Sequence, residues 1–250
     1  MLRNRVIPIV LLVDYAVVKT IQFTTRRNLG NPVVIANIYE NRKVDEIVFL
    51  DIDASKQGRG LDVDTINAVV EDCFMPITIG GGLRNCEDIE KALRAGADKV
   101  SLNSILLENM EFLKEAVSVF GSQCITVSID VKKNCNNDYI VYSHAHKDVN
   151  WSLTEFLRLV SEYKAGEILL NNVDLDGTMK GYDLQLINLV SSLSSIPVIA
   201  AGGASKPSDC ADAIKAGASA VAASSIFHFT SITPRICKRA MAEASIPVRL

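Results

Sequence analysis

Short apolar runs alternate with amphipathic stretches along the whole chain of 250 residues. The runs are rich in Val, Ile and Leu and mostly lack polar alternation, as do strands that are buried on both faces. They predict eight strands, at residues 6–12, 46–51, 76–79, 99–102, 124–129, 167–171, 197–201 and 220–224. The stretches between them predict helices that include residues 85–94, 107–119, 153–163, 184–194 and 207–215.

Eight strands that alternate with helices over this length predict a (β/α)8 TIM barrel. An open, doubly wound sheet is the alternative, but such sheets rarely have eight evenly spaced units or an internal repeat. Gly96 and Gly217 follow two of the helices where a left-handed cap is expected. No linker or low-complexity segment interrupts the pattern. We therefore expect a single barrel over residues 1–250, with half-barrels of about 1–120 and 121–250.

The two halves repeat one another in sequence. Residues 76–105 align without a gap with residues 197–226, at an offset of 121. Glu46 and Asp53 match Glu167 and Asp174 at the same offset. With an adjustment of two residues, the first strand aligns with the fifth. The repeat divides the barrel into strands one to four and strands five to eight.

The repeated segments also predict two phosphate sites. Glycine pairs follow strands three and seven, where backbone N–H groups can approach phosphate oxygens closely. Polar residues follow strands four and eight and add further donors. The residues are Gly81, Gly82, Asn103 and Ser104 in one half, and Gly202, Gly203, Ser224 and Ser225 in the other. They predict a ligand with a phosphate at each end, or two bound phosphate ions. Alternatively, the glycines serve only tight turns.

Composition narrows the function further. The apolar share of 48% allows a large core, but no run of about 18 apolar residues predicts a membrane span. A net charge of −3, without long charged blocks, argues against nucleic-acid and anionic membrane partners. The six cysteines lack C-x-x-C pairs and regular spacing, so we expect reduced thiols rather than disulfides or a metal. We expect a cytoplasmic protein without a cofactor.

Several motifs resemble the cyclase subunit of imidazole glycerol phosphate synthase. They are GGG at residues 80–82, ADKVS at 97–101, GSQ at 121–123, D-x-DGT-x-x-GYD at 174–183 and FH at 227–228. The resemblance spans residues 3–250. It implies a lyase of histidine biosynthesis with a bisphosphorylated substrate and a glutaminase subunit that supplies ammonia. It also implies that Lys19, Asp176 and Gly177 lie near the substrate.

The resemblance further implies an ammonia gate at the bottom of the barrel. By position, its residues are Arg5, Glu46, Lys99 and Glu167. Two cations and two anions on one axis could compensate one another where isolated burial is costly. The alternative is four solvated residues at the barrel bottom. The same face, including Arg5, Lys99, Asp98 and Gln123, is where we expect the glutaminase to bind.

One catalytic carboxylate of the family is absent from this chain. The family uses two aspartates, at the tops of strands one and five, for acid–base chemistry. Asp130 fits the position on strand five, but Leu11 occupies the position on strand one. The internal repeat also aligns Asp130 with Leu11. Asp14 lies three residues further on, and we expect it to face another direction.

Other departures accompany Leu11. Tyr15 and Thr20 replace family glycines, and Asn171 and Asn172 replace a pair of small hydroxyl residues. We therefore predict a divergent relative that passes ammonia to another acceptor. It resembles cyclase-like barrels that act with a glutaminase and a sugar amidotransferase to form acetamidino groups in surface-polysaccharide (O-antigen and lipopolysaccharide) synthesis.

Two alternatives stay open. The first is an authentic cyclase that makes imidazole glycerol phosphate and the aminoimidazole carboxamide ribotide AICAR, with Asp130 as its one essential carboxylate. The second is the sister isomerase of the pathway, which shares the barrel and both phosphate sites. That isomerase needs two aspartates and no ammonia gate, so the four gate residues argue against it.

Overall fold

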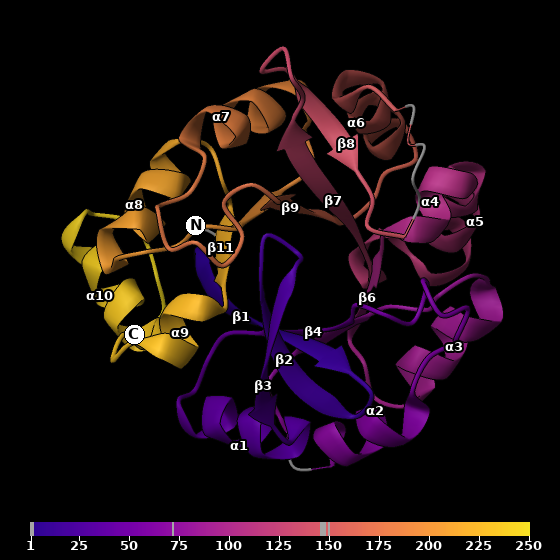
Figure 1. Ribbon diagram of the computed structural model, residues 1–250, viewed down its shortest axis with the longest axis horizontal. Helices are drawn as coiled ribbons and strands as arrows, with labels where there is room; N and C mark the ends of the chain where they lie inside the picture. Colours follow the sequence, from indigo (N-terminus) through magenta and orange to yellow (C-terminus); the bar gives the residue numbers. More distant parts are fainter. Residues whose placement is uncertain (1–2, 72, 146–148, 150) are drawn as a thin grey trace.

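The apolar runs form a closed barrel of eight parallel strands, which confirms the predicted fold (Figure 1). The computed structural model describes residues 3–71, 73–145, 149 and 151–250. The barrel strands are β1 (Arg5–Val13), β4 (Ile47–Asp51), β5 (Ile77–Gly80), β6 (Lys99–Leu102), β7 (Ile125–Lys133), β9 (Glu167–Asn172), β10 (Val198–Ala201) and β11 (Ala220–Ala223). Pairing of β11 with β1 closes the barrel, with Arg5 opposite Ala220 and Pro8 opposite Ala223.

The helices form a ring outside the strands (Figure 1). They are α1 (Pro32–Asn41), α2 (Val63–Val70), α3 (Cys86–Arg94), α4 (Ser104–Glu108), α5 (Glu111–Phe120), α6 (Leu153–Glu162), α7 (Leu184–Leu193), α8 (Pro207–Lys215), α9 (Ser225–Phe229) and α10 (Pro234–Glu243), with a 3₁₀ turn at Ser122–Cys124. Within the described ranges, no helix is long and apolar enough to cross a membrane.

Local sequence explains where several helices begin and end. The side chains of Asn85, Ser152 and Asp183 accept hydrogen bonds from backbone N–H groups in the first turns of α3, α6 and α7. Gly96 and Gly217 follow α3 and α8 with φ angles of 104° and 115°. These positive φ angles confirm the left-handed ends that were predicted for the two helices.

The prediction of a single helix at residues 107–119 is wrong in its first part. The structure has two helices there, because Asn109 leaves the helical region at φ −142° and ψ 89° and separates α4 from α5. Helix α4 begins directly after β6 and fixes Ser104 at the mouth of the barrel. The apolar periodicity of the sequence runs through this break and does not reveal it.

Antiparallel hairpins extend the first strand of each half-barrel. Strands β2 (Ala16–Ile21) and β3 (Thr25–Gly30) fold back from β1, and β8 (Tyr139–Tyr142) folds back from β7. Strands β1 and β7 each have nine residues. Strand β7 ends at Lys133, four residues beyond the predicted end at residue 129. The first hairpin lies across the barrel opening in Figure 1. Both hairpins therefore bring side chains to the end of the barrel where parallel strands finish.

Two apolar clusters surround the strands on their two faces. The larger one fills the space between the strands and the helices. The smaller one lies inside the barrel and consists of Ile7, Val48, Leu169, Ile199, Ala201, Ala220 and Ala222. Eight strands leave an interior only wide enough for side chains, which explains the alanines on β10 and β11. This inner cluster separates a polar layer at the barrel bottom from a cavity at the top.

Candidate functional site

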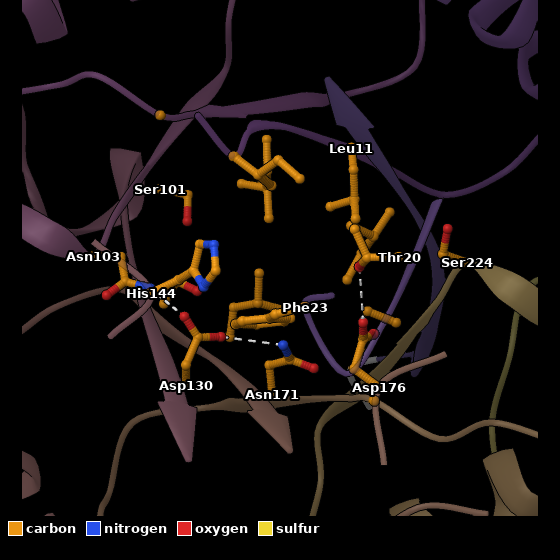
Figure 2. Close-up of a pocket in the computed structure, with 18 of the residues that line it drawn as sticks. Leu11, Thr20, Phe23, Ser101, Asn103, Asp130, His144, Asn171, Asp176 and Ser224 are labelled. Atoms are coloured by element: carbon orange, nitrogen blue, oxygen red, sulfur yellow. Dashed lines mark hydrogen bonds between the residues drawn. The ribbon is translucent and has the colours of Figure 1, made fainter. Parts of the chain in front are cut away.

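A cavity opens at the carboxyl ends of the barrel strands (Figure 2). The structure brings every residue predicted for catalysis or phosphate binding to its lining: Leu11, Lys19, Gly81, Gly82, Asn103, Ser104, Asp130, Asp176, Gly177, Gly202, Gly203, Ser224 and Ser225. These residues come from both half-barrels. The cavity thus joins the two repeated segments in one place, as active sites of this fold do.

Asp130 lies in this cavity between two amide side chains. Asn103 Nδ2 donates to Asp130 Oδ2 at 2.7 Å, and Asn171 Nδ2 donates to Asp130 Oδ1 at 3.1 Å. Burial raises the pKa of Asp130 to about 6, although the two amide hydrogen bonds oppose that shift. The charge of Asp176 raises the pKa further. A carboxyl group with this pKa can both take up and release a proton near neutral pH.

Leu11 presents an apolar side chain to the same cavity. It is 8% exposed and pairs with Leu50 on β4 and Val18 on β2. Asp14 lies beyond the end of β1, in the turn to β2, where it is exposed and does not line the cavity. The structure therefore places no carboxylate of β1 or of its following turn in the cavity.

The first hairpin is fastened to the loop after β9 by polar contacts. Lys19 Nζ lies 3.2 Å from Asp176 Oδ1, and Thr20 Oγ1 donates to Asp176 Oδ2 at 3.3 Å. The backbone N–H of Gln22 donates to the Asp176 carbonyl at 2.9 Å. Lys19 is only 3% exposed, so Asp176 compensates a nearly buried cation. This pair joins the first hairpin to the loop after β9 without adding net charge to the cavity.

The glycines of the repeated segments have a structural cause. An added Cβ would lie 2.3 Å from the Asp51 carbonyl oxygen at Gly81 and 2.1 Å from the Gly181 carbonyl oxygen at Gly203. Both glycines also have positive φ angles, of 106° and 105°. Close backbone packing alone thus requires glycine here, and the glycines by themselves do not identify a phosphate site.

The serines carry more information about a ligand than the glycines do. Ser225 Oγ is buried and has no hydrogen-bond partner within the described part of the chain. A buried hydroxyl without a partner is costly, and a bound oxyanion would satisfy it. Ser104, its counterpart in the repeat, begins α4 as Ser225 begins α9, and both line the cavity.

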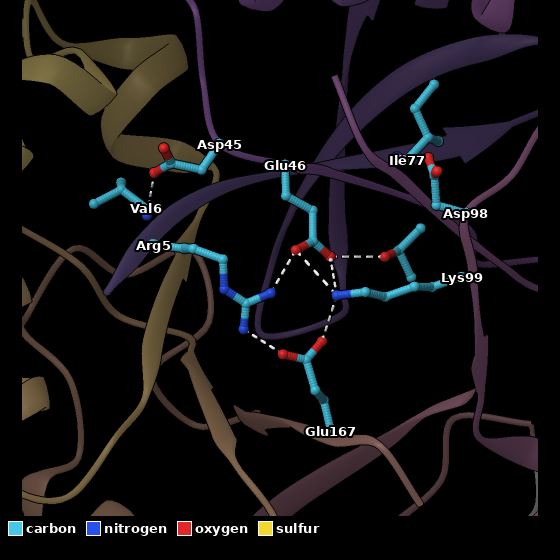
Figure 3. A network of polar contacts seen from close by, with 9 residues as sticks. Arg5, Val6, Asp45, Glu46, Ile77, Asp98, Lys99 and Glu167 are labelled. Carbon is cyan, nitrogen blue, oxygen red and sulfur yellow. Dashed lines mark hydrogen bonds and ion pairs between the residues drawn. The ribbon is translucent and has the colours of Figure 1, made fainter. Parts of the chain in front are cut away.

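At the opposite end of the barrel, the four predicted gate residues form one network (Figure 3). Arg5 pairs with Glu46 at 2.6 Å and also with Glu167. Lys99 Nζ lies 3.2 Å from Glu46 Oε1 and 2.6 Å from Glu167 Oε2. Thr78 Oγ1 donates to Glu46 Oε1 at 2.9 Å. The structure thus joins side chains from β1, β5, β6 and β9 with that of Glu46, which directly precedes β4, across the barrel axis.

Charge compensation keeps this network ionised. Burial alone would raise the pKa of Glu167, but Arg5 and Lys99 outweigh it and hold the pKa below its usual value. Burial likewise opposes the charge on Arg5, and the two glutamates raise its pKa nonetheless. The four formal charges sum to zero. A small neutral molecule could pass such a ring more readily than an ion could.

The residues predicted to bind a partner lie around this network. Asp98 and Gln123 are both exposed. The Asp98 carboxylate accepts a hydrogen bond from the Ile77 backbone N–H at 2.8 Å, which fixes its position beside Lys99. Among the residues that the structure describes, no cluster of His, Cys, Asp or Glu is arranged to hold a metal ion.

The sequence analysis did not predict the cavity residues that lie in or next to the two hairpins. Phe23 and His144 line the cavity and meet edge to face, with ring centroids 6.2 Å apart. Arg26 forms a two-pronged ion pair with Asp53, at 2.5 and 2.6 Å, and this contact lowers the pKa of Asp53. Asp53 was visible as the repeat counterpart of Asp174. Arg26, however, lies in a polar segment that gave no strand signal.

Asp51 is a further cavity carboxylate that was not predicted. Its Oδ1 accepts from the backbone N–H groups of Asp53 and Ala54, at 3.1 and 2.9 Å. Arg59 Nη1 binds its Oδ2 at 3.0 Å. These contacts occupy both oxygens of Asp51, so it shapes the loop after β4.

Comparison with known proteins is consistent with this geometry. A family model described as "Histidine biosynthesis protein" matches residues 5–233. A Campylobacter jejuni protein, named as a candidate imidazole glycerol phosphate synthase subunit hisF2, is 45% identical over all of both chains. The imidazole glycerol phosphate synthase subunit HisF of Caulobacter vibrioides is 44% identical over all of this chain and 97% of its own. The chain therefore belongs to the histidine biosynthesis family and, within it, to the HisF-like cyclase subunits of imidazole glycerol phosphate synthase.

Proposed function

We propose that this chain is the ammonia-conducting barrel of a glutamine-dependent amidotransferase complex and does not itself close an imidazole ring. A glutaminase subunit would deliver ammonia at the barrel bottom, and the barrel would release it at the top to another acceptor. That acceptor would be a sugar, in which an acetamidino group is formed for surface-polysaccharide synthesis in the cytoplasm. The observation that carries the proposal is Leu11, an apolar side chain in a cavity that also holds Asp130 and both predicted phosphate sites.

The other carboxylates of the cavity support the proposal because both are engaged. Asp51 is held by Arg59 and two backbone N–H groups, and Asp176 is held by Lys19 and Thr20. Neither can replace an acid or base at the Leu11 position without breaking these contacts. Ring closure needs one group that takes a proton and one that gives it, and Asp130 alone is unengaged by a cation.

The barrel bottom supports the ammonia-conducting part of the proposal. The ring of Arg5, Glu46, Lys99 and Glu167 gives a neutral entrance beside exposed Asp98, where the glutaminase would dock. Above it, Ser101 Oγ is buried without a partner among the described residues and lines the upper cavity. A hydroxyl in that place could hydrogen-bond with ammonia on its way to Asp130.

Retained phosphate binding is part of the proposal. The unpartnered Ser225 hydroxyl, with Gly203 and Lys19 in the same cavity, suits an oxyanion. We interpret these groups as inherited from a cyclase that held a bisphosphate. They support binding of phosphate or of a phosphorylated ligand, which does not require turnover.

An authentic cyclase is the second candidate, and Asp130 favours it. Its pKa of about 6 suits proton exchange, and its amide partners hold it in the cavity. In that case, the chain would make imidazole glycerol phosphate and AICAR with a single catalytic carboxylate.

A cyclase assay with ammonium salt separates the two candidates. The purified chain would be given phosphoribulosyl formimino aminoimidazole carboxamide ribotide, beside the Caulobacter relative as a positive control. We expect turnover at least about a hundredfold below that relative, because a missing acid or base costs this much. Turnover within about tenfold of it would overturn the proposal.

The variant Leu11→Asp tests the same proposal in the opposite direction, because it restores a carboxylate at this position. If the rest of the cavity is competent, this substitution raises turnover, and adding Asp130→Asn abolishes the gain. A thermal melt of each variant shows whether it is folded.

A further inference from the structure

An apolar patch forms part of the wall of the upper cavity. Leu11 on β1 and Leu50 on β4 are register partners, so their side chains lie next to each other on the inner face of the barrel. Ile9 precedes Leu11 by two residues and therefore points to the same face. All three residues line the cavity, and Figure 2 shows Leu11 across it from Asp130. The cavity thus has an apolar wall opposite a polar one.

A buried hydroxyl group lies on the strand next to this apolar patch. Ser225 is 6% exposed, and its Oγ has no hydrogen-bond partner within the described part of the chain. The residue follows β11, which pairs directly with β1, so Ser225 and Leu11 come from neighbouring strands. Neighbouring strands lie about 5 Å apart. A small ligand can therefore bind the Ser225 hydroxyl and cover the Leu11 patch at the same time.

The other half of the repeat does not offer the same donors. Asn103, the counterpart of Ser224, donates to Asp130 at 2.7 Å. Ser104, the counterpart of Ser225, is half-buried rather than buried. A buried hydroxyl without a partner is the costlier group, and so gains more from a bound oxyanion. The cavity therefore suits one phosphate group, held at Ser225, better than one at each end.

The polar wall opposite Leu11 suits the hydroxyl groups of a ligand. Asp130 accepts one hydrogen bond at each carboxylate oxygen, from Asn103 and from Asn171. Each oxygen of a carboxylate has two lone pairs, so both can also accept from a ligand hydroxyl. A ligand that matches all three features has one phosphate, several hydroxyl groups and a small apolar substituent.

We propose that the cavity binds a sugar phosphate that bears an acetamido group, with its phosphate at Ser225 and its acetyl methyl group against Leu11, Leu50 and Ile9. This inference rests on the proposed function, in which a sugar receives the ammonia, and adds that the barrel itself holds this sugar. Its ring hydroxyls face Asp130 on the opposite wall. Leu11 then determines specificity, because an aspartate at this position would set a charge against the methyl group.

The test is calorimetric titration of the full chain with three probes: N-acetylglucosamine 1-phosphate, glucose 1-phosphate and inorganic phosphate. We expect wild type to bind the acetylated probe at least about tenfold more tightly than glucose 1-phosphate, since a methyl-sized group in an apolar pocket has this effect. Leu11→Asn, which keeps the size of the side chain but makes it polar, should reduce this preference to less than about threefold. Leu50→Asn alters the same patch and should act in the same way.

Two further variants separate the apolar patch from the phosphate site. Ser225→Ala should weaken binding of all three probes by about tenfold and leave the preference for the acetylated probe unchanged, because it removes only the hydrogen bond to the phosphate. Asp14→Asn, at an exposed position outside the cavity, should change neither affinity nor preference. Circular dichroism melts show whether each variant is folded.

The outcomes separate the inference from the function on which it rests. Equal Kd values of wild type for the two sugar phosphates would overturn the inference, as would a preference that survives both Leu11→Asn and Leu50→Asn. If neither sugar phosphate binds, while the complex with the glutaminase still produces ammonia and closes no imidazole ring, the inference is wrong and the proposed function stands. Cyclase turnover close to that of the Caulobacter relative would overturn the proposed function itself.

Discussion

At the scale of single residues, Asp130 and Leu11 determine what the cavity can do. Two amides orient Asp130, and burial raises its pKa to about 6. Leu11 is buried against Leu50 and Val18 and offers no proton. The sequence repeat aligned these two positions because they occupy equivalent places on β1 and β7. Both positions line the same cavity, where only Asp130 can exchange a proton.

The raised pKa of Asp130 has a consequence for stability. The unfolded chain releases this proton near pH 4, but the folded protein holds it until about pH 6. The folded state therefore binds more protons between these values, and this group's contribution to stability is lost as pH rises through them. For Asp130→Asn, we expect the free energy of unfolding relative to wild type to increase by up to about 3 kcal/mol from pH 4 to pH 7.

Urea denaturation at several pH values measures this change. Asp212→Asn, at an exposed position on α8, serves as the control and should show no comparable trend. A difference between Asp130→Asn and wild type that stays constant with pH would contradict the burial of an easily protonated Asp130.

At the scale of elements, loops and hairpins line most of the cavity. The barrel strands fix where these loops and hairpins begin. The glycine segments after β5 and β10 pack so closely that side chains would collide with neighbouring carbonyl oxygens. The hairpin of β2 and β3 reaches the loop after β9 through Lys19, Thr20 and Gln22. The elements from the two halves therefore depend on one another at the cavity mouth.

The close packing of Gly203 predicts a specific cost. Gly203→Ala combines an unfavourable φ of 105° with a contact of 2.1 Å to the Gly181 carbonyl oxygen. Gly30→Ala has a similar φ of 107° but nothing within 4 Å, so it measures the backbone cost alone. We expect a loss of about 1–2 kcal/mol for Gly30→Ala and a clearly larger loss for Gly203→Ala. Equal losses of unfolding free energy in chemical denaturation would contradict this prediction. They would show that the contact between the added Cβ and the Gly181 carbonyl oxygen costs no stability.

The strands that were predicted and the strands that were missed differ in their sequence patterns. Buried runs such as residues 197–201 were recognised because they are continuously apolar and flanked by helices. Strand β3, with the sequence TRRNLG, was missed because it is polar and mostly exposed. The residues that it and β8 bring to the cavity, Arg26 and His144, were therefore missed as well. The repeat instead revealed Ser104 and Ser225, since matched positions at strand ends must converge in a closed barrel.

At the scale of the whole molecule, the barrel links two chemically different ends. A charge-neutral ring closes the bottom, an apolar cluster with small alanines fills the middle, and a polar cavity opens at the top. This order suits a path for a small neutral molecule from a partner at the bottom to an acceptor above. Under the proposed function, Leu11 would uncouple that path from ring closure.

The most direct measurement follows the amide nitrogen of glutamine. The complex of this chain with its glutaminase would receive glutamine labelled with ¹⁵N in the amide group, together with the phosphoribulosyl substrate of the cyclases. We expect labelled ammonia to be produced and no label in imidazole glycerol phosphate, whereas the complex with Leu11→Asp incorporates it. Label in imidazole glycerol phosphate from the wild-type complex, at a rate matching glutamine hydrolysis, would contradict the account.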